Sequence, residues 1–280
     1  HKSDLVVLAG RPSMGKTALA TNIAFSAASG DIKSKKSVAF FSLEMSAEQL
    51  ANRILAEQSG LSSDQIRRGK LSKENFSSLK NISEQISGNN LYIDDTPAIS
   101  VATMKTRARR LKRKINDDLG LIVVDYLQLM RGTRRFENRV QEISEITQGL
   151  KSVAKELNVP VLALSQLSRA VEQREDKRPH LADLRESGTI EQDADVVMFI
   201  YRQEYYEERA EPKSSGTETS LAFHERYVKW QENLEKCKSI ADIIVAKQRH
   251  GPIGSVQLHF ESKFTKFSNL TEENKQPRNI

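Results

Sequence analysis

Apolar and polar positions along this chain fall into two alternating kinds of block. One kind is a short, mostly apolar run rich in β-branched and aromatic residues, and the runs are LVVLA (5–9), VAFFS (38–42), LYID (91–94), LIVVD (121–125), VPVLALS (159–165), DVVMFIY (195–201) and IADIIVA (240–246). The other kind has helical periodicity, as in residues 137–157, where apolar side chains recur every three or four positions. Strands that are apolar on both faces and alternate with helices predict an α/β fold: a mainly parallel, twisted sheet covered by helices on both faces.

Two segments depart from this alternation. Near the C-terminus, Val256, Leu258 and Phe260 recur with period two around a polar turn, which predicts an antiparallel hairpin at one edge of the sheet. Residues 202–239 are mostly polar and contain the break EPKSSGTETS, so we interpret them as a surface insertion. The insertion carries one amphipathic helix, which we expect to pack on its own domain rather than to serve as a partner site. The apolar stripe of this helix is Tyr227, Trp230, Leu234 and Cys237.

Composition narrows the class of protein. The 280 residues are 38% hydrophobic and carry a formal net charge of +6, so the chain has ample core and favours an anionic partner such as nucleic acid. Cys237 is the only cysteine, which excludes an internal disulfide and fits a reducing, cytoplasmic compartment. No apolar run approaches the ~18 residues of a membrane helix, so we expect no membrane partner. Because the chain begins with His1 rather than Met, we expect a fragment of a longer protein.

The stretch GRPSMGKT (10–17) matches the phosphate-binding pattern G-x-x-x-x-G-K-T, and it lies between a predicted strand and a predicted helix. Gly10 and Gly15 let backbone N–H groups point at phosphate oxygens, and the helix N-terminus adds partial positive charge. Lys16 is expected to reach the β- and γ-phosphates, and Thr17 to hold Mg²⁺. A chance glycine turn is the alternative, and the strand, helix and spacing together argue against it. The predicted nucleotide-binding residues are Gly10, Arg11, Pro12, Ser13, Met14, Gly15, Lys16, Thr17 and Ala18.

Polar side chains at the ends of other predicted strands complete this site. Asp125 ends LIVVD and is expected to order Mg²⁺ through water. Glu44 follows VAFFS and is the candidate that activates the attacking water, although Ser42 or Ser46 could instead start a helix with Glu44 incidental. Gln166 either senses the γ-phosphate or is a solvated strand end. An N-K-x-D signature of guanine specificity is absent from the sequence, which favours ATP.

The stretch IADIIVAKQRHGPIG (240–254) runs from an apolar strand directly into Lys247 and Arg249. His250-Gly251-Pro252 then turns the chain away, and no acidic residue follows nearby. A cation at the end of a buried strand needs a partner, so the sequence raises the question of what Arg249 pairs with.

Several motifs in order along the chain resemble the C-terminal motor domain of the DnaB family, the hexameric replicative DNA helicases of bacteria. They are AGRPSMGKT (9–17), FSLEMS (41–46), VVDYLQLM (123–130), ENRVQEIS (137–144), LSQLSR (164–169), RESGTIEQDAD (185–195) and AKQRHGPIG (246–254). The resemblance spans nearly the whole chain, so we treat 1–280 as one motor domain. It implies a RecA-like P-loop ATPase that couples ATP hydrolysis at subunit interfaces to translocation on single-stranded DNA and duplex unwinding.

The resemblance also implies residue roles. Glu44 matches the catalytic glutamate, Asp125 the Mg²⁺-linked aspartate and Gln166 the γ-phosphate sensor. Lys247 and Arg249 match paired basic residues that reach the ATP site of the neighbouring subunit. Arg249 is therefore expected to lack a partner in its own chain and to pair with a phosphate bound to the next one.

The family's channel loop points to Arg185, Glu186 and Gly188 as the DNA contacts. An arginine pairs a phosphate, and a glycine permits close backbone approach, in a manner that ignores base sequence. The basic loop RGTRRFENR (131–139) either lines the same channel or is solvated. The run KTRARRLKRK (105–114) has helical periodicity, so we place Lys105 and Arg109 on the solvated face of a helix.

By resemblance, the partners are single-stranded DNA, five further copies of the chain in a homo-hexamer, primase and a helicase loader. The family's N-terminal domain and linker helix are expected to lie outside this chain, and the 202–239 insertion looks longer than is usual in the family. Two other functions stay open: a RecA-type recombination ATPase that forms filaments, and a nucleotide-gated binding module without turnover. Glu44 and Arg249 argue against the second of these.

Overall fold

The computed structural model describes residues 1–30, 35–69, 71–116, 118–132, 136–214 and 219–271, and for residues 185–189 it describes only the backbone. Within these ranges one sheet of nine strands runs through the molecule, in the order β3-β2-β4-β5-β1-β6-β7-β8-β9. The strands are β1 (Leu5–Gly10), β2 (Ser37–Ser42), β3 (Leu91–Asp94), β4 (Leu119–Asp125), β5 (Val161–Gln166), β6 (Val196–Tyr201), β7 (Ile240–Gln248), β8 (Gly254–Glu261) and β9 (Lys266–Asn269).

The strands from β3 to β6 in this order pair in parallel, and β7, β8 and β9 continue the sheet in antiparallel fashion. The predicted strands and the C-terminal hairpin are therefore confirmed. One detail is wrong: the run IADIIVA is not part of the parallel set, because β7 returns antiparallel beside β6. The helix α9 (Ser220–Cys237) leaves and re-enters the sheet at the same end, so it makes a hairpin-like excursion instead of a crossover.

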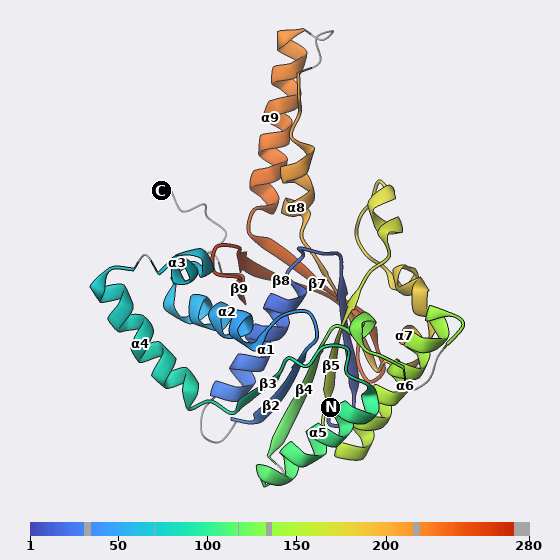
Figure 1. Ribbon diagram of the computed structural model, residues 1–280. Coiled ribbons are helices and arrows are strands. Elements are labelled where there is room, and N and C mark those ends of the chain that lie inside the picture. Colours follow the sequence, from blue (N-terminus) through green and yellow to red (C-terminus); the bar gives the residue numbers. More distant parts are fainter. Residues whose placement is uncertain (31–34, 70, 117, 133–135, 215–218, 272–280) are drawn as a thin grey trace.

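Helices cover both faces of the sheet, as Figure 1 shows. On one face lie α1 (Lys16–Ser29) and α2 (Ala47–Ser59), with α3 (Ser63–Arg68) and α4 (Lys73–Ser87) outside them. On the other lie α5 (Val101–Lys114), α6 (Arg139–Leu157) and α7 (Gly188–Asp193). Four 3₁₀ segments within the described ranges join these elements: η1 (Leu127–Leu129), η2 (Arg169–Gln173), η3 (Leu181–Ser187) and η4 (Glu208–Ala210).

Each helix layer buries an apolar stripe against the sheet. The helix predicted at 137–157 is α6, whose stripe packs against one face and consists of Ile143, Ile146, Leu150, Val153, Ala154 and Leu157. Fully burying a large aliphatic side chain contributes about 1.5–3 kcal/mol, so these contacts dominate the stability of that layer. Small residues of α1, such as Ala20, Ala24 and Ala28, let it lie close to the opposite face.

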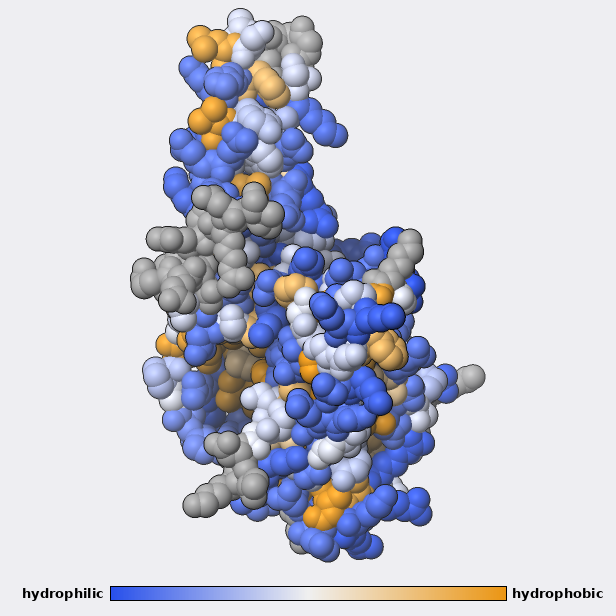
Figure 2. All heavy atoms as spheres, turned by 90° about the vertical axis from the view of Figure 1, so that its left-hand side faces the viewer, coloured by the Kyte–Doolittle hydropathy of each residue, from blue (hydrophilic) through white to orange (hydrophobic). Residues whose placement is uncertain are grey.

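The insertion is an arm that stands out from the body. α8 (Gln203–Glu207) lies against the body through Tyr205 and Tyr206, and α9 packs on α8 and projects beyond it (Figure 1). The indole of the predicted apolar stripe faces α8, because Trp230 Nε1 donates to the carbonyl of Glu207 at 2.8 Å. The arm's surface is mostly hydrophilic, with scattered apolar residues (Figure 2). Its start needs a correction: Arg202 is 7% exposed and belongs to the body.

The basic run of α5 is only partly solvated. Arg109 is exposed, as predicted, whereas Lys105 is half-buried, and both form ion pairs with Glu156 of α6. The prediction of a simple solvated face therefore needs a correction, because α5 and α6 lie side by side and an acidic residue of α6 faces the basic run.

Membrane insertion was also considered at the level of helices. Among the described residues, no helix has the length and apolarity needed to cross a bilayer.

Candidate nucleotide site

The phosphate loop lies where β1 ends and α1 begins. Ser13 and Gly15 have φ values of 66° and 98°, so the backbone turns back on itself before α1 starts at Lys16. Gly10 allows a close approach to β6, since a Cβ there would lie 2.7 Å from Cγ2 of Ile200. This backbone path brings the loop N–H groups to the N-terminus of α1, which is the arrangement that binds phosphate.

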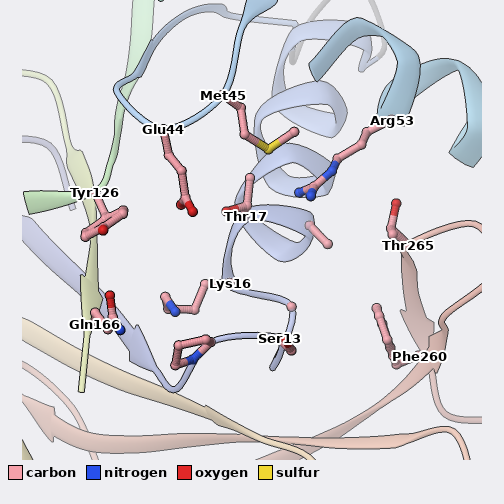
Figure 3. A pocket seen from close by; sticks show the side chains of 13 residues that line it. Ser13, Lys16, Thr17, Glu44, Met45, Arg53, Tyr126, Gln166, Phe260 and Thr265 are labelled. Atoms are coloured by element: carbon pink, nitrogen blue, oxygen red, sulfur yellow. The ribbon is translucent and has the colours of Figure 1, made fainter. Parts of the chain in front are cut away.

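A cavity of about 380 Å³ opens above this loop. The pairing of parallel strands brings the predicted residues to it, because Gly10 lies opposite Gln166 and Ser42 lies opposite Asp125. Figure 3 shows Glu44, Tyr126 and Gln166 on one side of Lys16, and Arg53, Phe260 and Thr265 on the other. The lining residues are Pro12, Ser13, Gly15, Lys16, Thr17, Ala18, Glu44, Met45, Arg53, Tyr126, Gln166, Phe260 and Thr265.

Three residues of the predicted nucleotide set do not line this cavity: Gly10, Arg11 and Met14. The Arg11 side chain turns away, with Nε bound to Glu172 Oε1 at 2.8 Å and Nη1 donating to the carbonyl of Leu167. Met14 is buried in the core at 1% exposure. Because these two side chains are committed elsewhere, only the loop backbone at these positions is available to a phosphate.

Lys16 is the central cation of the site. Its Nζ donates to the carbonyls of Gly10 and Arg11, at 2.8 and 3.2 Å, which holds the ammonium over the loop. Burial lowers the pKa of Lys16 to about 8, although Asp125 and Glu44 act to raise it. A buried ammonium whose hydrogen bonds go to carbonyls is poised to pair with an anion.

Asp125 ends β4 beside Thr17 and is 1% exposed. Both of its carboxylate oxygens are buried and lack a hydrogen-bond partner among the described residues. Burial raises the pKa of Asp125 to about 6, with Glu44 adding to the shift and the nearby Thr17 hydroxyl, Lys16 and Arg53 opposing it. A buried carboxylate without a partner needs a counter-charge, so Asp125 and Thr17 fit a hydrated Mg²⁺.

Glu44 lies in the loop between β2 and α2. Ser46 is the N-cap of α2 and forms a capping box with Gln49, so the helix-start interpretation is confirmed for Ser46. Glu44 has no part in that cap, and its carboxylate points into the cavity toward Thr17 (Figure 3). It also shifts the pKa of Lys16, Asp125 and Tyr126, which places its charge within reach of all three.

Gln166 lines the cavity rather than bulk solvent. The side chain of Gln128, in η1, holds its backbone from both sides: Nε2 donates to the Gln166 carbonyl and Oε1 accepts its N–H, each at 3.2 Å. Gln128 thereby links the strand end of Asp125 to that of Gln166. Sequence reasoning missed Gln128, because a glutamine after a strand carries no signal of its partner.

Arg53 is another residue that sequence reasoning missed. It lies on α2, half-buried, and its guanidinium points into the cavity near Thr17 (Figure 3). Burial lowers its pKa, while Asp125 and Glu44 act to raise it. A signal did exist, since Leu50, Ile54 and Glu57 place Arg53 on the buried face of α2. A cation on such a face requires a partner.

Lys247 and Arg249 lie at the opposite end of the strands from this cavity, because Lys247 pairs with Val197 near the start of β6. Nζ of Lys247 donates to the carbonyls of Glu191, Gln192 and Ala194, at 2.6, 3.3 and 2.7 Å. Nη1 of Arg249 lies 3.3 Å from Oδ1 of Asp195. The expectation that Arg249 has no partner in its own chain is therefore wrong: its partner precedes β6, the strand beside β7. The Arg249 side chain is still 63% exposed.

The predicted DNA contacts fall where η3 meets α7. The backbone places Arg185 in η3 and Gly188 at the start of α7, whereas the side chains of Arg185 and Glu186 lie outside the described residues. Of the second basic loop, Arg139 is tied to Glu142 and to the Gln128 carbonyl. Arg131 is exposed, while Arg134 and Arg135 lie outside the described residues.

Known proteins share this sequence and geometry. A family model described as "DnaB-like helicase C terminal domain" matches residues 1–269. The chain belongs to this family. It is 55% identical to "Replicative DNA helicase DnaB" of Rickettsia bellii, over 99% of the chain and 55% of that protein. It is 47% identical to the protein of the same name from Geobacillus stearothermophilus, over 96% of the chain and 53% of that protein. The chain thus spans about half the length of the curated relatives it matches.

Solved DnaB-like structures confirm the predicted RecA-like fold. The chain superimposes with a TM-score of 0.81 and 36% identity on a solved helicase ATPase domain, over 97% of the chain and 86% of that domain. The same score and identity hold for "The Structure Of A DnaB-Like Replicative Helicase And Its Interactions With Primase", over 96% of the chain and 58% of that one.

Proposed function

We propose that the chain is the ATP-hydrolysing motor of a replicative DNA helicase, which couples hydrolysis to translocation on single-stranded DNA and duplex unwinding. The observation that carries the proposal is the buried carboxylate of Asp125, without a hydrogen-bond partner in the described residues and adjacent to Thr17, Lys16 and Glu44. Membership of the DnaB-like family and the names of the curated relatives favour this function over a recombination ATPase.

The residues divide the work of hydrolysis. Lys16 and the loop backbone bind the β- and γ-phosphates, and Thr17 and Asp125 hold Mg²⁺, which when bound offsets the charge of those phosphates. Glu44 orients the attacking water and accepts its proton. Gln166 contacts the γ-phosphate and reports its loss to the segment beyond β5. Arg53, Phe260 and Thr265 form the end of the cavity left for ribose and base.

The assembly and partners are part of the same proposal. Arg249 and Lys247 act on the ATP bound by a neighbouring subunit of a homo-hexamer, and Arg185, Glu186 and Gly188 contact single-stranded DNA. One of the similar solved helicases is described with its primase interactions, which supports a primase contact here. A loader is proposed on family resemblance alone. The proposed compartment is the cytoplasm, where bacterial chromosomal DNA is replicated.

The proposal is tested by ATP hydrolysis in the full-length protein, with and without single-stranded DNA. Lys16→Ala is expected to abolish tight ATP binding, because the loop loses its cation. Glu44→Gln is expected to retain binding and to reduce turnover by about 10²-fold or more, since the water orienter is lost. The matched control is Glu48→Gln, an exposed glutamate in the first turn of α2. Normal hydrolysis by Glu44→Gln contradicts the assignment, and binding without any turnover in the wild type supports the gated binding module.

A further inference from the structure

One wall of the nucleotide cavity is built by the β8–β9 hairpin. Phe260 of β8 and Thr265 of the turn line this wall, across the cavity from Glu44 (Figure 3). β9 is the last strand of the described sheet, and its only strand partner there is β8. Ladder hydrogen bonds set the register of this hairpin but not its distance from α1, so another contact sets the width of the cavity.

Asn22 of α1 ties the hairpin to both helices beside the phosphate loop. Its Oδ1 accepts the backbone N–H of Phe267 at 2.7 Å, and its Nδ2 donates to Oε2 of Glu57 on α2 at 2.6 Å. Glu57 is 9% exposed, and burial raises the pKa of its carboxyl. Both polar ends of one amide are used in a region where an unmade hydrogen bond is costly.

The strand residue that Asn22 holds, Phe267, touches two parts of the site. Its ring centroid lies 4.5 Å from that of Phe260, the residue opposite it in the hairpin. Its Cζ lies 3.0 Å from the position that a Cβ on Gly15 would take, so it also packs on the phosphate loop. Contacts therefore run from Asn22 through Phe267 to the wall at Phe260.

We infer that Asn22 is a positioning residue that fixes the β8–β9 wall for the ribose and base of the nucleotide. The inference rests on the proposed function, because it concerns the same site. The phosphates are held by Lys16, Thr17 and the loop backbone, and no described hydrogen bond of the Asn22 side chain goes to these groups. The nucleoside extends past α1 to Phe260, where apolar ring surface packs against it. Asn22 accordingly contributes to the affinity for the nucleoside part and leaves the affinity for the triphosphate part unchanged.

The test compares two ligands, ATP and inorganic triphosphate, both with Mg²⁺, by calorimetry on the full-length protein. Asn22→Leu has similar size and removes both hydrogen bonds. We expect the Kd for ATP to rise about tenfold, as for the loss of one or two hydrogen bonds, and the Kd for triphosphate to stay within about twofold. Equal weakening of both ligands overturns the inference, since Asn22 then acts on the phosphate site as a whole. Unchanged ATP affinity also overturns it.

A swapped pair guards against loss of folding. Asn22→Asp alone keeps the acceptor for Phe267 but places two carboxyl groups together, whereas Asn22→Asp with Glu57→Gln restores both hydrogen bonds, because the new amide donates to the new carboxylate. The double variant is expected to recover ATP affinity that the single variant loses, and absence of recovery argues against the inference. Ser26→Ala, at an exposed position one turn along α1, is the matched control. If the wild type binds neither ligand, the proposed function fails instead.

Discussion

Cys237 is a buried thiol at the end of α9, where the arm joins the sheet. It is 7% exposed, and burial raises its pKa to about 11, with Glu207 and Glu204 adding to the shift. The thiolate is the reactive form, and moving the pKa from about 9 to about 11 lowers its fraction at pH 8 by about 100-fold. We therefore expect iodoacetamide to alkylate the folded protein at least that much more slowly than the protein in urea.

The sign of the pH dependence follows from the raised pKa. The thiol form is favoured in the folded state, so its contribution to stability is complete below pH 9 and is lost as the pH rises toward 11. The alkylation rate of the folded protein should keep rising across that interval, while the unfolded control levels off earlier. Equal rates at pH 8 contradict burial of this thiol.

The sequence predicts some residues of the site and not others, for a physical reason. Lys16, Glu44, Asp125 and Gln166 follow recognisable strands or the phosphate motif, and parallel pairing brings such ends to one edge of the sheet. Residues that reach the cavity through packing of distant elements carry no local signal of it, and these are Gln128, Phe260 and Thr265. Asn22 joins segments separated by 245 positions, which no periodicity reveals.

At the scale of elements, α5 and α6 are joined by a small charge cluster. Glu156 of α6 pairs with Lys105 and Arg109 of α5, and the hydrogen bond from Lys105 is the main cause of its lowered pKa. Because the folded pKa is depressed, the stabilisation is present above the ordinary glutamate pKa of about 4.3 and is lost as the pH falls below it. The carboxylate is exposed to solvent, so salt screens both pairs.

We expect Glu156→Ala to lower the urea midpoint of unfolding slightly at pH 7 in low salt. The difference from wild type should vanish in about 1 M salt, where the Debye length is about 3 Å, and should fade as the pH falls below about 4. Glu232→Ala, an exposed change on α9, is the control and should shift nothing. A difference that persists unchanged in high salt shows that Glu156 acts through packing rather than charge.

The sequence also predicts elements better than their directions. Strand positions follow from apolar runs, but the antiparallel return of β7 depends on where α9 leaves and rejoins the sheet, which composition does not encode. The solvated face assigned to α5 was incomplete for a similar reason. Helical periodicity identifies a polar face but not the neighbouring helix, and here α6 brings Glu156 to it.

At the scale of the whole molecule, DNA binding is expected to depend on the η3–α7 segment. Arg185→Ala should weaken binding of single-stranded DNA about equally for all sequences and should reduce the salt dependence of binding by about one phosphate contact. Arg110→Ala, an exposed change on α5, is the matched control. Binding measured by fluorescence anisotropy at several salt concentrations separates the two. The reverse pattern moves the DNA contact to α5.

Arg249 connects one subunit to the next. Its in-chain pair with Asp195 is long at 3.3 Å and exposed on the arginine side, and Asp195 keeps a second cation, Lys151, when Arg249 leaves. Such a pair contributes little to stability, so the guanidinium is free to exchange Asp195 for a phosphate bound to a neighbour. A donated arginine of this kind contributes about 10³–10⁵ in turnover.

Mixed subunits test this exchange in a way that loss of activity does not. An Arg249→Ala subunit keeps Glu44 but donates no arginine, and a Glu44→Gln subunit has an inactive site but still donates Arg249. Each is expected to be nearly inactive alone in the full-length protein. After subunit exchange, part of the ATPase rate should return at interfaces where an intact site meets an intact arginine. If mixed assemblies form and stay inactive, Arg249 acts within its own chain, and the pair with Asp195 is its functional contact rather than a resting one.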